Sequence, residues 1–226
     1  MLPKTTVIGS TGLIGKYFLE SICEGDFQNA TAATRQKIPS LEKKNFIKQS
    51  VHDFSDLEMM RSDLKTDVLV CSLGTTIKKA GSADQFMKID HDLPLEIAKM
   101  AKEEGCKTMI LISSIGANSQ STIIYNRVKG LLEEALGEIC FERFHILRPS
   151  LLLGKRTESR PVEFFCKLIM QPLSFLIPWK YRLILAIDIA DTIKHLIIDN
   201  TGEHIWKGNV LFEMNGSRNY KYDQSN

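Results

Sequence analysis

Short apolar segments alternate with longer segments of helical periodicity along this chain. The apolar segments at 5–8, 67–71 and 108–113 have the length and the composition of strands that are buried on both faces. The segments at 13–23 and 94–104 instead repeat their apolar residues at helical spacing. Because strand and helix patterns alternate along the chain, they predict an α/β fold with a Rossmann-like doubly wound parallel sheet in three layers.

Weaker signals extend the same pattern to the C-terminus. Ser55 and Glu58 have the spacing of a capping box, which predicts a helix up to about Leu64. Further strands are expected at 30–34, 46–49, 144–147 and 209–213, and further helices at 125–136, 162–170 and 189–198. We predict one domain over residues 1–226, with a small C-terminal extension formed by residues of about 150–190 and 205–215.

Three glycines stand where the first strand runs into the first helix. Gly9, Gly12 and Gly15 have the spacing GxxGxxG. A glycine at the strand end permits a tight turn, a second lets phosphate oxygens approach the backbone, and a third lets helix and strand pack closely. The first amides of the helix then bind a pyrophosphate. The alternative is a glycine-rich surface turn, but the position after an N-terminal strand favours a dinucleotide site.

The residues after the second strand indicate which nicotinamide cofactor binds. Arg35 and Lys37 stand where an NAD-binding chain usually carries an acid for the ribose hydroxyls. A guanidinium binds a 2′-phosphate and a carboxylate repels it, so we predict NADP(H) rather than NAD(H), unless Arg35 is only a solvated loop residue. Leu73 and Gly74 follow the strand at 67–71 and are expected beside the adenosine ribose.

Asp53 follows the third predicted strand and has two interpretations. Its carboxylate is placed to accept a hydrogen bond from the adenine amino group. Alternatively, His52 and Asp53 only lead into the cap at Ser55. The sequence leaves both open.

Tyr125 and Lys129 are four residues apart on a predicted helix and therefore share one of its faces. A free phenol has a pKa of about 10, and a neighbouring ammonium group stabilises the phenolate. The pair is therefore suited to proton transfer. Ser113 and Ser114 end the preceding strand. Ser114 is the preferred residue to hold a substrate carbonyl, and strand-end capping is the alternative.

These motifs together resemble a known family. The chain is similar to the atypical branch of the short-chain dehydrogenase/reductase superfamily, and within it to the Tat-interacting-protein-like family of NADPH-binding proteins, which has fungal mitochondrial relatives. The resemblance covers about residues 5–200. It is carried by Gly9–Gly15, Gly74–Thr76, Lys88–Asp92, Ser113-Ser114 with Gly116-Ala117, Tyr125 with Val128–Gly130, and Leu147–Pro149 through Leu153-Gly154.

The resemblance implies roles for further residues. Phosphate contacts would come from Ser10, Thr11, Leu13 and Ile14. Pro149 and the residues after it, through Leu152, would line the carboxamide side of the cofactor. The asparagine that the superfamily often carries after strand four has no counterpart, and Asp90 and His91 stand nearby instead.

Composition narrows the choice of function. The chain is 43% hydrophobic and 25% charged with a net charge of +2, and it has no basic tract of the kind that binds nucleic acid. Five widely spaced cysteines without a CxxC pair predict buried, reduced thiols and no metal site. No apolar run reaches the length of a membrane span. With no targeting segment evident before the first strand, we expect a cytoplasmic protein.

Three functions fit these residues. The first is NADPH-dependent reduction of a small carbonyl compound, with Tyr125, Lys129 and Ser114 as the catalytic residues and the extension on the substrate side. The second, suggested by the resemblance, is NADPH-dependent recognition of a protein partner through the apolar segment at 164–179. The third is a sugar-nucleotide epimerase or dehydratase, for which the third of the chain after Pro149 is short. A homodimer is expected in addition.

Overall fold

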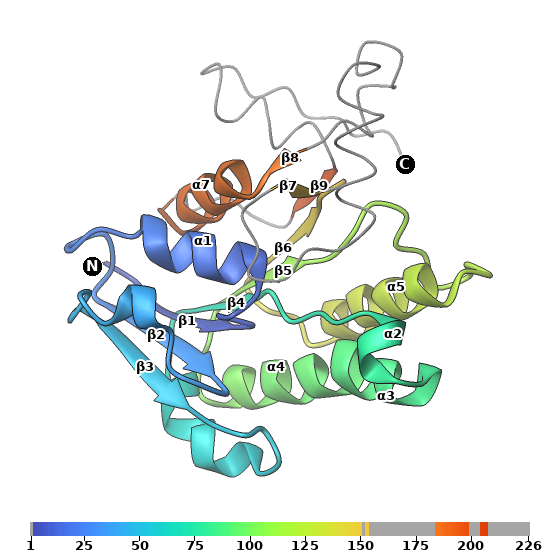
Figure 1. Cartoon of the computed structure of the whole chain (residues 1–226), viewed down its shortest axis with the longest axis horizontal. Coiled ribbons are helices and arrows are strands. Elements are labelled where there is room, and N and C mark those ends of the chain that lie inside the picture. The colour runs from blue at the N-terminus through green and yellow to red at the C-terminus, as the bar shows by residue number, and fades with distance from the viewer. Residues whose placement is uncertain (1, 151, 154–183, 199–203, 208–226) are drawn as a thin grey trace.

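A computed structural model describes residues 2–150, 152–153, 184–198 and 204–207 of the chain (Figure 1). Seven of the described strands form one parallel sheet in the order β3-β2-β1-β4-β5-β6-β9. They are β1 (Lys4–Ile8), β2 (Asn29–Thr34), β3 (Ile47–Val51), β4 (Val68–Cys71), β5 (Thr108–Ile112), β6 (Arg143–Arg148) and β9 (His204–Lys207). The short strands β7 (Leu152–Leu153) and β8 (Ile184–Leu185) pair separately.

Helices cover both faces of the sheet, which confirms the predicted three-layer Rossmann-like fold (Figure 1). On one face α1 (Leu13–Ser21) packs against α7 (Ala186–Ile198). The other face carries the 3₁₀ helix η2 (Leu57–Leu64), α4 (Leu93–Glu103) and α5 (Ile124–Gly137). A short 3₁₀ turn, η1 (Pro39–Leu41), precedes β3.

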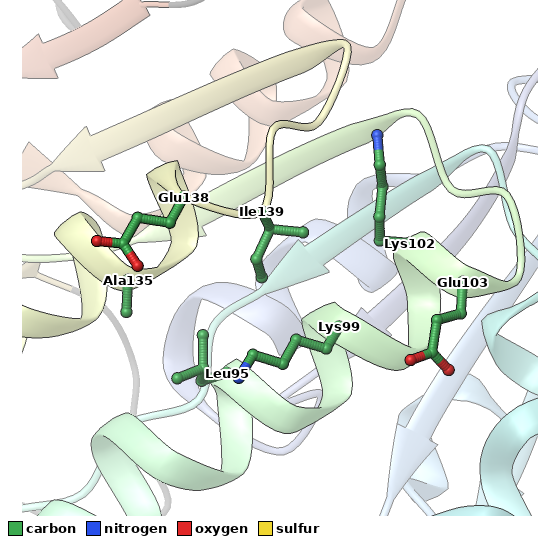
Figure 2. Close-up of a pocket in the computed structure, with 7 residues that line it drawn as sticks. All are labelled: Leu95, Lys99, Lys102, Glu103, Ala135, Glu138 and Ile139. Atoms are coloured by element: carbon green, nitrogen blue, oxygen red, sulfur yellow. The ribbon is translucent and has the colours of Figure 1, made fainter.

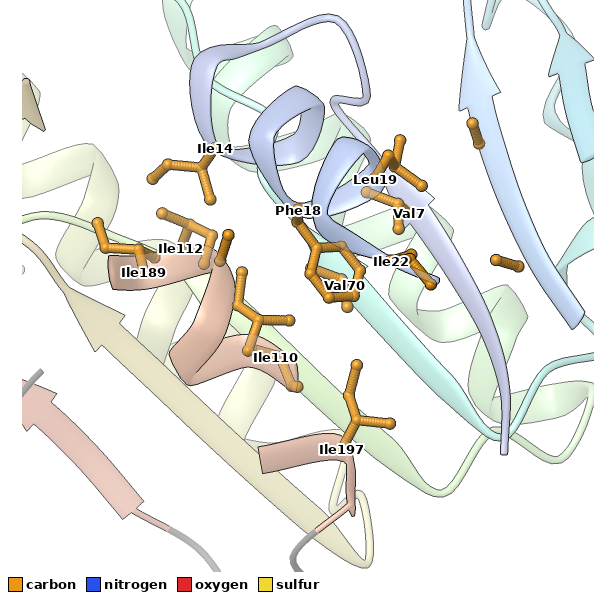
Figure 3. Close-up of a cluster of buried hydrophobic side chains, with 14 of the residues drawn as sticks. Val7, Ile14, Phe18, Leu19, Ile22, Val70, Ile110, Ile112, Ile189 and Ile197 are labelled. Carbon is orange, nitrogen blue, oxygen red and sulfur yellow. The ribbon is translucent and has the colours of Figure 1, made fainter. Parts of the chain in front are cut away.

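Alternation along the central strands divides the core in two. Val7, Val70 and Ile110 point toward α1 and α7, where they surround the fully buried ring of Phe18 (Figure 3). Their neighbours along the strands point to the opposite face, where Ile8, Leu69, Met109 and Leu111 meet η2, α4 and α5. Because successive side chains of a strand face opposite ways, a strand between two helical layers must be apolar throughout.

The predicted capping box is wrong. The backbone N–H and hydroxyl of Ser55 both donate to Asp53 Oδ1 at 2.8 Å, so the serine belongs to a local turn. Asp56 caps the helix instead, because its Oδ1 accepts the N–H of Glu58 at 3.1 Å. Aspartate and serine are both good N-caps, and the sequence pattern alone did not separate these adjacent positions.

Three short elements between β4 and α4 were not predicted. They are α2 (Ile77–Ala80), α3 (Ala83–Met87) and the π-helical turn η3 (Lys88–Asp92), which runs directly into α4. Side-chain caps begin the first two: Thr76 Oγ1 accepts the N–H of Lys79 and Ser82 Oγ accepts the N–H of Gln85. Each is about one helical turn, which is too short to show a hydrophobic period.

Several predicted features lie outside the described residues. They are the helix at 162–170, the strand at 209–213 and most of the proposed extension. The last described strand, β9, pairs with β6 from His204 onward, ahead of the position that the sequence predicted. Within the described ranges, no helix is both long enough and apolar enough to cross a membrane.

The strand order reverses between β1 and β4. From β1 the chain builds outward to β2 and β3 on one side, and it then returns to place β4, β5 and β6 on the other. All neighbouring strands are parallel, so their carboxyl ends share one edge. In open α/β sheets ligands bind at that edge, at the point of reversal.

Candidate functional site

The glycine turn after β1 packs directly against the end of β4. Gly9 has a φ of +80°, and a Cβ atom there would lie 2.5 Å from the carbonyl carbon of Ser72. A Cβ at Gly15 would lie 2.6 Å from both the Gly9 oxygen and Ser72 Oγ. The N–H of Gly12 donates to the Gly9 oxygen at 2.8 Å and closes the turn. Side chains at Gly9 and Gly15 would therefore force the turn away from the point of strand reversal.

The turn leaves the N-terminus of α1 open. Gly12 is the N-cap and supplies no capping side chain, and the first turn contains no acidic residue. The Ser10 hydroxyl points inward and donates to Val7 O at 2.8 Å, with Ala33 O at 3.2 Å, so it joins the turn to β2. Thr11 is exposed. The first amides of α1 thus form an electropositive end that suits an anion.

Arg35 and Asp53 follow β2 and β3 at the same edge of the sheet. Arg35 is exposed, and its guanidinium has no hydrogen bond or ion pair with any residue that the structure describes. Asp53 is also exposed. The backbone N–H of Ser55 and then its hydroxyl hold the pKa of the Asp53 carboxyl below its usual value. Arg35 is therefore free to bind a ligand, whereas one oxygen of Asp53 already belongs to the local turn.

Lys129 is buried and has a buried counter-ion. Its Nζ lies 2.9 Å from Oδ2 of Asp90, and both side chains are at most 3% exposed. Burial by itself lowers the pKa of Lys129, but the attraction of Asp90 and then of Tyr125 outweighs it, so the net pKa is raised. Lys129 is therefore a stable ammonium group.

Tyr125 lies on the same face of α5 as Lys129, one turn earlier. Its ring stacks on the fully buried ring of Phe86 from α3, with centroids 5.8 Å apart and planes 28° apart. The side chain itself is half-buried. Stacking thus restrains the tyrosine ring and leaves part of the side chain accessible.

One segment after β4 contacts both the glycine turn and the lysine. Ser72 lies against Gly9, and the next residue, Leu73, offers its carbonyl oxygen to Lys129 Nζ at 3.5 Å. A Cβ at Gly74 would lie 3.6 Å from Lys129 Nζ, so this exposed residue borders the ion pair. The structure therefore brings the two main sequence motifs together on the segment 72–74.

The strand-end serines carry unsatisfied hydroxyl groups. The Oγ atoms of Ser113 and Ser114 are buried and have no hydrogen-bond partner among the described residues. The next residue, Ile115, donates its N–H to the carbonyl of Pro149 at 2.9 Å, which joins the ends of β5 and β6. Leu152 is half-buried against the α1–α7 core. Because an unpaired buried hydroxyl is costly, the two serines suit a ligand that would pair with them.

The structure adds three residues that sequence reasoning did not assign to the site. Asp90 pairs with Lys129, Phe86 stacks on Tyr125, and Ser72 supports the glycine turn. The spacing of Phe86 and Asp90 repeats that of Tyr125 and Lys129, which is a signal in the sequence. This repeated spacing indicates paired contacts only once the two helical segments are known to face each other.

A surface groove of about 400 Å³ lies away from these residues. It lies between α4 and the C-terminal end of α5, and its lining residues are Leu95, Lys99, Lys102, Glu103, Ala135, Glu138 and Ile139 (Figure 2). None of its lining residues belongs to the glycine turn, the tyrosine–lysine pair or the serine pair. This groove is therefore separate from the candidate functional site.

The cysteines are only partly as expected. Cys71 and Cys106 are buried, but Cys23 and Cys140 are exposed, so the expectation that the thiols are buried is wrong for the latter two. These four cysteines, which are the ones in the described part of the chain, are free thiols, and Cys166 lies outside the described residues. In the part of the chain that the structure describes, no group of three or more His, Cys, Asp or Glu side chains is arranged to hold a metal ion.

One known protein family has a profile that matches most of the chain. The profile of the HIM1 family covers residues 27–181. The chain belongs to the HIM1 family. Relatives include protein HTATIP2 of Rattus norvegicus, which is 38% identical over 71% of this chain and 67% of its own length. Another is the mitochondrial protein fmp52 of Emericella nidulans, 36% identical over 72% of each chain. The resemblance inferred from the motifs is thus confirmed.

Solved structures support the fold of this HIM1 family member. The Bordetella bronchiseptica enzyme WbmH, solved in complex with NAD+, superimposes with a TM-score of 0.72 at 15% identity, over 92% of this chain and 76% of its own. The UDP-Glc/GlcNAc 4-epimerase of Campylobacter jejuni has a TM-score of 0.68 at 14% identity, over 90% of this chain and 78% of its own. At such low identity the likeness establishes the fold alone.

The predicted cytoplasmic localisation is wrong. Relatives from Emericella nidulans, Saccharomyces cerevisiae and Candida albicans, 36–37% identical, are named mitochondrial proteins, which contradicts the expectation. The expectation depended on the residues before the first strand, and they do not decide the compartment.

Proposed function

We propose that this HIM1 family member binds NADPH and reduces a small carbonyl compound. One observation carries the proposal: the glycine turn and the Tyr125–Lys129 pair meet through the segment 72–74, at the point where the strand order reverses. A dinucleotide that begins at the N-terminus of α1 and ends beside Lys129 would cross that segment. The NAD+ bound to WbmH, a protein of the same fold, supports a nicotinamide cofactor.

The residues present fit such a cofactor. The pyrophosphate would bind at the first turn of α1, which has no capping side chain and no acid to repel it. The exposed guanidinium of Arg35 would bind the 2′-phosphate, and this residue supports NADPH over NADH. Leu73 and Gly74 would border the adenosine ribose, and Pro149 and Leu152 the carboxamide. For Asp53, binding the adenine amino group remains a proposal beside its role in the turn.

The proposed reaction assigns one task to each catalytic residue. Bound NADPH supplies the hydride that adds to the carbonyl carbon. Tyr125 donates its phenolic proton to the carbonyl oxygen, so that the carbonyl becomes an alcohol, and solvent returns a proton to the phenolate. Lys129 stabilises that phenolate through its positive charge. Ser114 donates its unpaired hydroxyl hydrogen to the carbonyl oxygen and orients it.

The test combines binding with turnover. Fluorescence titration of the purified protein with NADPH and NADH measures both affinities, and a panel of aldehydes and ketones is then screened by the loss of NADPH absorbance. We expect tighter binding of NADPH and at least one substrate that is reduced. Failure to bind either cofactor would refute the proposal.

Other outcomes would point to the remaining functions. NADPH binding without reduction of any carbonyl would favour NADPH-dependent recognition of a protein partner. Binding and conversion of a nucleotide sugar would favour an epimerase, an activity that the Campylobacter jejuni protein of the same fold carries in its name. Sedimentation of the same sample tests the homodimer that the sequence predicts.

A further inference from the structure

Two pairs of residues with the same spacing face each other across the site. Phe86 and Asp90 lie four residues apart on α3 and η3, and Tyr125 and Lys129 lie four residues apart on α5. Phe86 stacks on Tyr125, and Asp90 pairs with Lys129. One turn of helix thus contacts both members of the proposed proton-transfer pair.

We propose that Asp90 is the positioning residue that holds Lys129 in place as an ammonium group beside the nicotinamide end of the cofactor. This inference rests on the proposed function. Asp90 acts through Lys129 and is not itself a catalytic residue.

The two oxygens of Asp90 join separate parts of the site. Oδ2 lies 2.9 Å from Lys129 Nζ on α5, and Oδ1 accepts the backbone N–H of Thr75 at 2.7 Å in the chain after β4. The carboxylate therefore fixes the distance between α5 and the segment that borders the glycine turn. Among the described residues, Lys129 Nζ forms an ion pair with Asp90 and donates to the Leu73 carbonyl, so it keeps hydrogen-bonding capacity for a hydroxyl of the nicotinamide ribose.

The charge of Lys129 depends on this carboxylate. The titratable groups that face Nζ are Asp90 from η3, Tyr125 from α5 and Cys71 from β4. Burial raises the pKa of the Cys71 thiol to about 11, so this group is neutral at physiological pH. Burial lowers the pKa of Lys129, and Asp90 is the main influence that raises it. Without the carboxylate, burial would dominate and Lys129 would lose its proton at a lower pH.

The test follows Lys129 directly by NMR of lysine side chains labelled with ¹³C, in which Lys129→Met assigns the resonance. Wild type, Asp90→Asn and Asp92→Asn are titrated without cofactor from about pH 6 to about pH 11. Asparagine keeps an oxygen for the Thr75 N–H and removes only the charge. Asp92 is a matched control, because its carboxylate lies on the same turn but is half-exposed and pairs with His91 at 2.9 Å.

We expect Asp90→Asn to lower the pH at which Lys129 titrates by about one unit or more, and Asp92→Asn to leave it unchanged. The pH above which NADPH affinity declines, measured on the same samples, should fall in Asp90→Asn by the same amount as the pH at which Lys129 titrates. In the Lys129→Met background, Asp90→Asn should cause no further loss of NADPH affinity.

An unchanged Lys129 titration in Asp90→Asn would overturn the inference, and so would an equal loss of NADPH affinity with and without Lys129. If Asp90→Asn alone does not fold but the double variant with Lys129→Met does, the uncompensated charge is the cause and the inference holds. If neither folds, Asp90 serves packing and the inference fails. Wild-type protein that titrates as expected but binds no NADPH would refute the proposed function alone.

Discussion

Gly9 and Ser72 lie in backbone contact where β1 and β4 end side by side. A Cβ atom on Gly9 would be 2.5 Å from the carbonyl carbon of Ser72, and the φ of Gly9 is +80°. The glycine is therefore required twice, by its conformation and by its neighbour. The contact also brings the glycine turn beside the segment that Lys129 touches.

Comparing alanine substitutions at Gly9 and Gly25 separates the cost of the positive φ from the cost of the contact with Ser72. Gly25 also has a positive φ, of +90°, but a Cβ there would meet no atom within 4 Å. We expect Gly25→Ala to lower the free energy of unfolding by about 1–2 kcal/mol. Gly9→Ala should lower it by about 1–3 kcal/mol more, because the backbone of Ser72 is held in place by its N–H bond to the oxygen of Ile8 at 2.9 Å. Urea unfolding measures both, and equal losses would contradict the packing argument.

Tyr125→Phe should slow turnover strongly with little effect on cofactor binding. The ring and its stacking on Phe86 remain, and only the proton donor is lost. We expect kcat to fall by about 10²- to 10⁴-fold, with the NADPH dissociation constant changed by less than about twofold. Tyr17→Phe, on α1 outside the proposed proton-transfer pair, is the matched control. Turnover at the wild-type rate in Tyr125→Phe would reject the mechanism.

Arg35→Glu should reverse the preference between the two cofactors. A carboxylate at this exposed position repels the 2′-phosphate and accepts hydrogen bonds from ribose hydroxyls. We expect NADPH to bind about 10- to 100-fold more weakly and NADH at least as tightly as in wild type. Fluorescence titration measures both constants, with Lys43→Glu as a control for charge alone. Equal weakening in the two variants would remove Arg35 from the site.

Cys71 should make the protein less stable at alkaline pH. Burial raises the pKa of this thiol from 9.0 to about 11. As the pH rises from about 9 to about 11, the thiol ionises in the unfolded chain but not in the folded protein, so the free energy of unfolding falls. The loss is about 2–3 kcal/mol for two pH units.

The measurement is urea unfolding at a series of pH values. Cys71→Ala should show a shallower alkaline decline than wild type, whatever its stability at neutral pH. Cys106, whose pKa burial raises to about 12, should behave in the same way. Cys23→Ala is the control, because that thiol is exposed and should leave the slope unchanged. Parallel slopes for Cys71→Ala and wild type would contradict the prediction.

The sequence by itself determined the features that depend on near neighbours along the chain. Strands buried on both faces are apolar throughout and amphipathic helices repeat at helical spacing, so the parallel sheet and its main helices were predicted. The glycine turn and the shared face of Tyr125 and Lys129 are also local, because each spans only a few residues. The one-turn elements α2, α3 and η3 were missed because they contain too few residues for a period.

Tertiary structure alone decided which of these parts meet. Asp90 and Lys129 are far apart in the sequence, and nothing local to either specifies that one neutralises the other in the interior. Likewise, Ser72 supports the glycine turn only because β4 lies next to β1 in the sheet. Such contacts depend on strand order and helix packing, which arise from the burial of the whole chain and not from the spacing of any one motif.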